Sequence, residues 1–311
     1  MNPQEIIADL RKQDIEILTE ERLGKVITEV PNPVTYIGLE PSNVIHIGNL
    51  SASIPVFKLA KHGFKAIILL ADLHALANDK GEISEIQKFA ASDRDMYEKV
   101  ARKLGVGGKL EYRYGTEFED QKYFIQMLRL SRVINFTEAE KSMDEISKSS
   151  VSRMTSSLIY PLMQVLDIGV LGVNVGVGAI DQRKVHVLAI ENLKKLGYPT
   201  PVAIHSKLIM QGTDGKRKMG KSFGNTINLD ETQDSLEAKI KKTYLAPGDV
   251  DVNPILGWYK ALIFPVLDHP LGFGSKEFSN HPELEKAWKD NEITPQELKR
   301  STIRDLADLL I

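Results

Sequence analysis

Short apolar segments that alternate with longer helical ones constrain the fold of this chain more than any other feature. Buried-strand patterns rich in Val, Ile and Leu occur at 34–39, 64–72, 109–114, 170–179 and 201–206. Helix-period patterns separate them, at 47–61, 83–104, about 119–168 and 181–197. Strands that are joined through helices form parallel sheets with right-handed crossovers. We therefore predict an α/β fold with a doubly wound, Rossmann-type parallel sheet.

The two ends of the chain have a different pattern. An amphipathic helix is expected over about 3–28, and the buried-strand pattern is lost after Asn228, where helical segments at 231–245 and 296–310 remain. A length of 311 residues corresponds to about two domains. We predict a Rossmann-type domain over 1–228, with an inserted helical segment at about 119–157, and a smaller, mostly helical domain over 229–311.

Composition excludes several classes of protein. The chain has no cysteine, which removes disulfide frameworks and thiolate metal sites, and its seven histidines show no metal-binding spacing. We therefore expect no tightly bound metal or organic cofactor. The net charge of −2 means that a nucleic-acid partner has to meet a local basic patch. Because the N-terminus lacks a signal-peptide pattern and no apolar run approaches ~20 residues, we expect a cytoplasmic protein without a membrane partner.

The first candidate site is His46-Ile47-Gly48-Asn49, which follows the first strand of the predicted sheet and begins a helix. Ligands of doubly wound folds bind at the carboxyl ends of strands, and helix N-termini favour phosphate. Gly48 permits close approach of a ligand, and His46 and Asn49 can donate hydrogen bonds to phosphate or ribose. The alternative is an ordinary strand–helix loop in which His46 and Asn49 only cap the helix.

The second candidate is the basic loop Lys218-Met219-Gly220-Lys221-Ser222. Two lysines in a glycine-containing loop suit the neutralisation of a polyphosphate. Gly215, Gly220, Lys221 and Ser222 also satisfy the P-loop formula, but that motif requires a helix after the serine, and here FGNTINLD follows. A solvated basic loop is the other alternative.

The third candidate is a polar stripe on a predicted helix. Tyr160, Gln164 and Asp167 are spaced i, i+4 and i+7, which places them on one face among apolar neighbours. This arrangement predicts a pocket wall that reads a small polar ligand. A fourth polar cluster, 181–184, begins the helix that follows the next strand, although it also fits ordinary helix-start chemistry.

Taken together, these blocks resemble a class I aminoacyl-tRNA synthetase, with HIGN in place of the HIGH element and KMGKS in place of KMSKS. The segments YIGLEPSNVIHIGN, IILLADLHALAN, IYPLMQVLDI and GAIDQRKVHVLA are similar to tyrosyl-tRNA synthetases of the archaeal and eukaryotic kind. The resemblance extends over nearly the whole chain. The four blocks are highly specific jointly, whereas no single block is.

The resemblance implies roles for individual residues. Tyr36 and Asp167 hold the phenolic hydroxyl of tyrosine, with His74 as a weaker pocket candidate, and Tyr160, Gln164 and Gln182 surround its amino and carboxylate groups. The residues implied in ATP binding are Gly38, Glu40, His46, Gly48, Asn49, Lys218, Met219, Lys221 and Ser222. Among these, the residues implied in catalysis are His46, Asn49, Lys218 and Lys221. The residues implied in tRNA contacts are Arg183, Lys184, Phe273, Pro295 and Glu297.

The implied reaction joins L-tyrosine to tRNA(Tyr) through a tyrosyl-adenylate that is made from Mg-ATP. The resemblance also implies a homodimer that forms through residues 124–136, and an anticodon-binding role for residues 229–311. Asn49 and Gly220 depart from the family elements. We expect contact with ATP to be kept, and the sequence makes no prediction for the rate of adenylate formation. A tryptophanyl-tRNA synthetase, a catalytically silent RNA-binding relative and a P-loop NTPase are the alternatives. Dependence of pyrophosphate exchange on each amino acid discriminates among them.

Overall fold

A computed structural model describes residues 1–42, 44–142, 154–207 and 210–311 of the chain. The strands are β1 (Ile15–Leu18), β2 (Val34–Leu39), β3 (Lys65–Leu70), β4 (Leu110–Tyr114), β5 (Val175–Ala179), β6 (Val202–Ser206), β7 (Leu271–Phe273) and β8 (Lys276–Phe278). The helices up to the last strand of the main sheet are α1 (Pro3–Leu10), α2 (Glu20–Glu29), α3 (Ile47–Lys61), α4 (Asp72–Ala77), α5 (Ile83–Lys103), η1 (Gly115–Glu117), α6 (Gln121–Leu130), α7 (Phe136–Ser142), α8 (Ser156–Val170), η2 (Ile180–Gln182), α9 (Arg183–Asn192) and η3 (Leu193–Leu196). The helices after it are η4 (Lys221–Phe223), α10 (Gln233–Lys242), α11 (Pro254–Trp258), the π-helix η5 (Tyr259–Ile263), α12 (Phe264–Leu267), α13 (His281–Lys289) and α14 (Pro295–Leu310).

A six-stranded sheet organises the larger part of the described chain, in the order β1-β6-β5-β2-β3-β4. All neighbours pair in parallel except β1, which lies antiparallel to β6 at one edge. The central strands consist largely of buried Val, Ile and Leu, as expected for a parallel sheet that is covered on both faces. The prediction of a doubly wound α/β fold is therefore confirmed.

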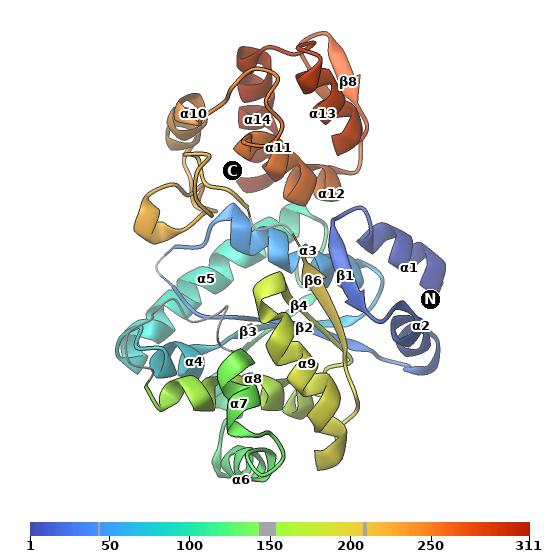
Figure 1. The fold of residues 1–311 in the computed structure, drawn as a ribbon, viewed down its shortest axis with the longest axis vertical. Helices are drawn as coiled ribbons and strands as arrows, with labels where there is room; N and C mark the ends of the chain where they lie inside the picture. The colour runs from blue at the N-terminus through green and yellow to red at the C-terminus, as the bar shows by residue number, and fades with distance from the viewer. Residues whose placement is uncertain (43, 143–153, 208–209) are drawn as a thin grey trace.

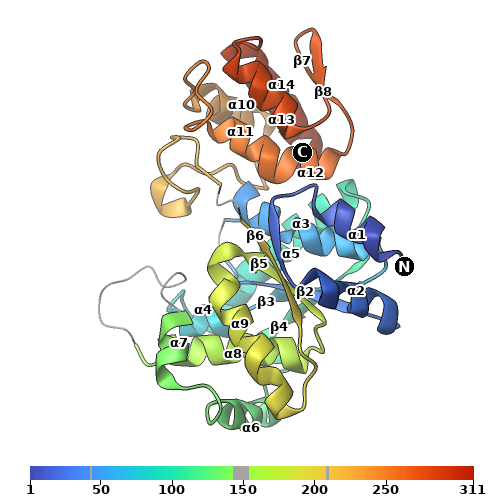
Figure 2. The same cartoon turned by 45° about the vertical axis from the view of Figure 1, so that its right-hand side comes forward.

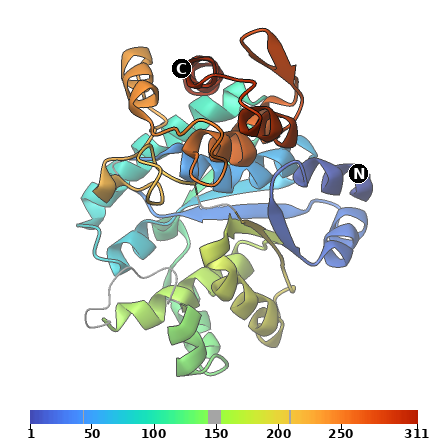
Figure 3. The same ribbon diagram turned by 45° about the horizontal axis from the view of Figure 1, so that its top comes forward.

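Helices cover the two faces of this sheet (Figure 3). Tyr36, Ile67 and Leu69 contribute to the core on the α8 and α9 side, whereas Ile37 and Ile68 face α3 and α5. This alternation follows from the two-residue period of a strand. The helices α6 and α7 extend the α8 side farther from the sheet (Figure 1), and β7 and β8 form a hairpin at the opposite end of the molecule (Figure 2).

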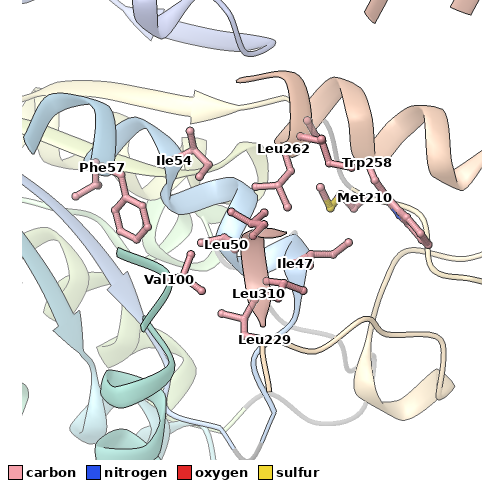
Figure 4. Close-up of a cluster of buried hydrophobic side chains, with 14 of the residues drawn as sticks. Ile47, Leu50, Ile54, Phe57, Val100, Met210, Leu229, Trp258, Leu262 and Leu310 are labelled. Atoms are coloured by element: carbon pink, nitrogen blue, oxygen red, sulfur yellow. The ribbon is translucent and has the colours of Figure 1, made fainter. Parts of the chain in front are cut away.

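The C-terminal helices pack directly on α3. Leu50 on α3 lies in one apolar cluster with Trp258, Leu262 and Leu310, all of them buried (Figure 4). The nitrogen of the Trp258 indole donates a hydrogen bond of 2.9 Å to the Gln211 carbonyl. The core on this side of the sheet therefore continues into the C-terminal part and holds the segment after β6 in place.

Most predicted elements of the larger part appear within a few residues of their expected bounds, and two differ. The single helix predicted over 3–28 is wrong, because Ile15–Leu18 forms β1 and divides it into α1 and α2. The four residues of β1 pair with β6, and Ser206 lies opposite Ile15 although the two are 191 positions apart in sequence, so no local signal marks this strand. The strand predicted over 170–179 begins only at Val175, because α8 continues to Val170.

In the C-terminal part, α10 and α14 confirm the two predicted helices, and the β7–β8 hairpin is an addition to them. Of the predicted insertion at 119–157, residues 143–153 lie outside the described residues. None of the helices within the described ranges has the length and apolar character that crossing a bilayer requires.

Candidate active site

The sheet changes direction of winding between β2 and β5. These strands are adjacent and parallel, yet the chain continues from β2 to β3 on one side and from β5 to β6 on the other. Such a point leaves a crevice at the carboxyl ends of the strands, where doubly wound proteins bind ligands. Gly38 is exposed although β2 is a central strand, so the described part of the chain leaves the sheet uncovered at this point. The sequence-predicted residues on β2, α8 and η2 gather around this crevice.

Asp167 is a buried residue on α8. Its side chain is fully buried on α8, and its Oδ1 accepts a hydrogen bond of 2.7 Å from the Tyr123 hydroxyl. Burial, and then the charge of Asp167, raise the pKa of the Tyr36 phenol well above its usual value. Tyr36 and Asp167 are therefore near neighbours in the fold.

Several buried atoms of Asp167 and its neighbours have no hydrogen bond within the described part of the chain. They are Oδ2 of Asp167, Oε1 of Glu119 and both ring nitrogens of His74. His74 Nε2 lies 3.5 Å from Asp167 Oδ2, and burial lowers the pKa of His74 to about 4, so this imidazole is neutral at pH 7. Because buried polar groups normally have partners, these atoms are available to a polar ligand.

Other residues of the candidate site are linked by hydrogen bonds across elements. The Tyr160 hydroxyl donates to Glu40 Oε1 at 2.6 Å, and the Asn78 amide donates to the same carboxylate. Gln164 Nε2 donates to Gln182 Oε1 at 2.9 Å, while Gln164 Oε1 is buried without a partner in the described residues. Four of the residues that the resemblance placed around substrate are thus joined in two pairs, Tyr160 with Glu40 and Gln164 with Gln182.

His46 and Asn49 form a capping box at the start of α3. His46 Nδ1 accepts from the Gly48 amide at 3.2 Å, and Asn49 Oδ1 accepts from the His46 amide at 3.1 Å. The capping interpretation is therefore correct for these atoms. It also keeps the N-terminus of α3 in a fixed position after β2, where the positive end of the helix dipole favours phosphate.

A short backbone ladder connects the two predicted ATP elements. The Ile47 amide donates to the Ile227 carbonyl and the Leu229 amide donates to the Ile45 carbonyl, both at 2.9 Å, with His46 opposite Asn228. These bonds anchor the strand-like segment that follows the basic loop directly beside the HIGN element. Residues 180 to 184 positions apart in sequence are therefore neighbours in the fold.

The basic loop itself is organised by a side chain that sequence reasoning missed. Asn225 Oδ1 accepts from the Gly220 amide at 3.0 Å, and its Nδ2 donates to the Lys218 carbonyl and to Asp214. The Lys218 side chain is exposed and that of Met219 is buried, while the Lys221 side chain lies outside the described residues. The chain continues from Lys221 through the short η4 rather than an α-helix, which contradicts the P-loop alternative.

The predicted tRNA contacts have three different environments. Arg183 is exposed and its Nε donates to Glu16 at 2.9 Å, and Lys184 follows on the same helix. Pro295 and Glu297 begin α14, where Glu297 forms a capping box with Thr294. Phe273 is 1% exposed and packs on Tyr259 and Phe278, so its position argues against the predicted anticodon contact and assigns it to the C-terminal core.

Three pocket residues carried no usable signal in the sequence: Tyr123, Glu119 and Asn78. They precede Asp167 by 44, 48 and 89 positions and come from three different segments. Among the described residues, one oxygen of Glu119, one oxygen of Asp167 and one ring nitrogen of His74 lie within 4.8 Å of one another. Only the tertiary fold brings these three side chains together, because they come from three different segments of the chain.

Comparison with known proteins identifies the relatives of this chain. Residues 30–310 match the family model of class I tRNA synthetases (W and Y). Tyrosine–tRNA ligases of Methanosarcina mazei and Archaeoglobus fulgidus are 37% and 38% identical to the chain, covering 97% and 95% of it and 96% and 92% of their own lengths. The crystal structure of tyrosyl-tRNA synthetase from A. fulgidus, complexed with L-tyrosine, superposes with a TM-score of 0.90 at 36% identity over 100% of this chain and 98% of that one.

A tryptophanyl-tRNA synthetase from Encephalitozoon cuniculi shares the fold, with a TM-score of 0.76 at 17% identity over 100% of this chain and 88% of that one. The fold and the site define a class I aminoacyl-tRNA synthetase. The chain belongs to the tyrosyl-tRNA synthetase family, in its archaeal branch.

Proposed function

We propose that this protein is a tyrosine–tRNA ligase in which the residues gathered at the crevice between β2 and β5 perform both steps. The carboxylate of tyrosine attacks the α-phosphorus of Mg-ATP, which gives tyrosyl-adenylate and pyrophosphate. A ribose hydroxyl at the 3′ end of tRNA(Tyr) then takes the tyrosyl group and releases AMP. Because the substrate carboxylate is already ionised at pH 7, the first step needs no general base.

The observation that carries this proposal is the unsatisfied oxygen of buried Asp167. Its Oδ1 is occupied by Tyr123, and its Oδ2 has no partner within the described residues. A phenolic hydroxyl can donate to Oδ2 and accept from Tyr36, whereas phenylalanine leaves a buried polar group without a partner. A site built in this way discriminates strongly against the analogue that lacks the hydroxyl. Gln164 and Gln182 then face the amino and carboxylate groups of tyrosine.

Adenylate formation is catalysed by positioning and charge. The N-terminus of α3, with His46, Gly48 and Asn49, holds the nucleotide, and the loop with Lys218 and Lys221 neutralises the pyrophosphate as it leaves. The ladder between 45–47 and 227–229 supports this assignment, since it keeps the base of the loop beside His46. Movement of the loop over bound ATP is the expected gate. Met219 and Ser222 complete this element.

The test is pyrophosphate exchange with tyrosine, phenylalanine or tryptophan as the only amino acid. We expect exchange that depends on tyrosine, followed by charging of a tRNA with a C1–G72 end in preference to one with G1–C72. Exchange driven by tryptophan instead, or ATP hydrolysis without any amino acid, would contradict the proposal. Arg183 and Lys184, together with Pro295 and Glu297, are the proposed tRNA contacts, and a cytoplasmic location stays a prediction.

Gly38→Ala is expected to raise the KM for tyrosine about five-fold, equivalent to roughly 1 kcal/mol. A Cβ at this position would lie 3.1 Å from the Tyr36 hydroxyl, which has to move away from the substrate. Thermal stability should hardly change, because Gly38 is exposed. Steady-state exchange kinetics measure the effect, and an unaltered KM for tyrosine would show that Tyr36 does not read the phenol.

Homodimer formation is proposed through α6, within the segment predicted from the sequence. Phe124, Ile125 and Leu128 are about half exposed on one face of α6, and Phe136 at the start of α7 is 64% exposed. An apolar patch of this kind marks a protein interface. We expect Leu128→Glu to convert the dimer to a monomer in light scattering, while Arg129→Glu on the adjacent exposed position does not. A wild-type monomer at micromolar concentration would contradict the interface.

A further inference from the structure

Three acidic groups converge at the phenol end of the pocket. Asp72 follows β3, Glu119 lies between η1 and α6, and Asp167 lies on α8. Glu119 Oε1 and Asp167 Oδ2 are buried atoms without a hydrogen bond in the described residues. One oxygen of Glu119, one of Asp167 and a ring nitrogen of His74 lie within 4.8 Å of each other. Gly115 permits Glu119 and Asp72 to lie close together, because a side chain at this position would collide with both Glu119 Oε1 and Asp72 Oδ1.

No positive charge compensates these carboxyl groups in the described part of the chain. Asp72 has neutral partners, Thr116 and Gln87, and neither Glu119 nor Asp167 has a lysine or arginine within ion-pair distance. The groups that face Glu119 and Asp167 from α4, α6 and β2 are His74, Tyr123 and Tyr36. The imidazole is neutral and the two phenols cannot give up protons near pH 7.

A buried pair of carboxyl groups in this situation holds a proton. Burial, with the charge of Asp72, raises the pKa of Glu119 to about 7. Burial, followed by the charge of Glu119, raises the pKa of Asp167 well above its usual value. The Tyr123 hydroxyl already occupies Asp167 Oδ1, so a proton on Asp167 would sit on Oδ2 and block the atom that has to accept the substrate hydroxyl.

We propose that Glu119 is a specificity-determining residue that shares one proton with Asp167 and so sets the pH at which Asp167 can accept the phenolic hydrogen of tyrosine. This inference rests on the proposed function. When the proton is on Asp167, tyrosine loses its acceptor and binds little better than phenylalanine. As the pH rises, Asp167 ionises and tyrosine is preferred. Tyrosine selectivity therefore increases with pH across the titration of the pair.

The test compares kcat/KM for tyrosine and for phenylalanine in pyrophosphate exchange from pH 5.5 to 8.5. In Glu119→Gln, Asp167 loses its like-charged neighbour, and its pKa falls. We expect the inflection in the tyrosine profile to move at least one pH unit lower, so that tyrosine activity one unit below the wild-type inflection rises about five-fold. The ratio to phenylalanine should rise equally. Glu119→Asp should keep the wild-type profile, as should Glu85→Gln, which removes an exposed carboxylate on α5.

The outcomes separate the two proposals. Absence of tyrosine-dependent exchange by the wild type at pH 8 refutes the proposed function. Tyrosine-dependent exchange with superimposable profiles for wild type and Glu119→Gln refutes only the role of Glu119, and so does an equal shift for phenylalanine. If the glutamine variant does not fold, Glu119→Ala removes the same charge and is expected to show the same shift.

Discussion

Asp167→Asn is expected to lower kcat/KM for tyrosine by about one to two orders of magnitude, while kcat/KM for phenylalanine stays nearly constant. With Oδ1 still accepting from the Tyr123 hydroxyl, the amide puts an uncharged NH2 donor in the place of Oδ2, and hydrogen bonds to charged groups contribute roughly 1.5–3 kcal/mol. Phenylalanine has no hydroxyl that could donate to Oδ2, so the substitution does not change its kcat/KM. The tyrosine to phenylalanine ratio should therefore narrow by the same factor.

Competition between the two amino acids in pyrophosphate exchange gives this ratio directly. Phenylalanine activity serves as the internal control, since a variant that is merely misfolded loses both activities together. Asparagine also preserves the volume of a fully buried side chain and an acceptor for the Tyr123 hydroxyl. An unchanged ratio in a folded variant would remove Asp167 from tyrosine recognition.

Lys218→Ala is expected to slow adenylate formation by about two to three orders of magnitude, with a small change in the KM for tyrosine. The positive charge is required as pyrophosphate leaves, so its loss affects the transition state more than the bound substrates. Lys221→Ala should have an effect of similar size. Single-turnover formation of tyrosyl-adenylate measures this step separately from tRNA charging.

Lys216→Ala is the matched control, because Lys216 is an exposed lysine of the same loop, two positions earlier. Its removal changes the net charge of the loop equally but should leave the rate within about two-fold, since a solvated charge that does not reach the phosphates contributes little. Equal losses in the two variants would indicate a general electrostatic effect of the loop rather than a contact by Lys218.

Residue patterns within single segments were sufficient for much of the fold. The buried strands β2, β3 and β6 and the helices α3, α5 and α14 agree with expectations from apolar periodicity, because each has a continuous local pattern. The stripe of Tyr160, Gln164 and Asp167 on α8 was also predictable, since helix geometry alone places these residues on one face.

Tertiary structure decided the features whose parts are far apart in sequence. The strand β1 exists because β6 offers an open edge, and the basic loop lies beside His46 because residues 227–229 pair with 45–47. In the same way, Tyr123 and Glu119 meet Asp167 only after α6 has packed on α8. Apolar periodicity and helix capping depend on residues that are close together in the sequence. Strand pairing at a sheet edge and the environment of a buried carboxyl group depend instead on segments that only the tertiary fold brings together. The local sequence, together with the family resemblance, therefore predicted the residues that are proposed to bind tyrosine and ATP, whereas the packing of distant segments decided how the Asp167 carboxylate is held.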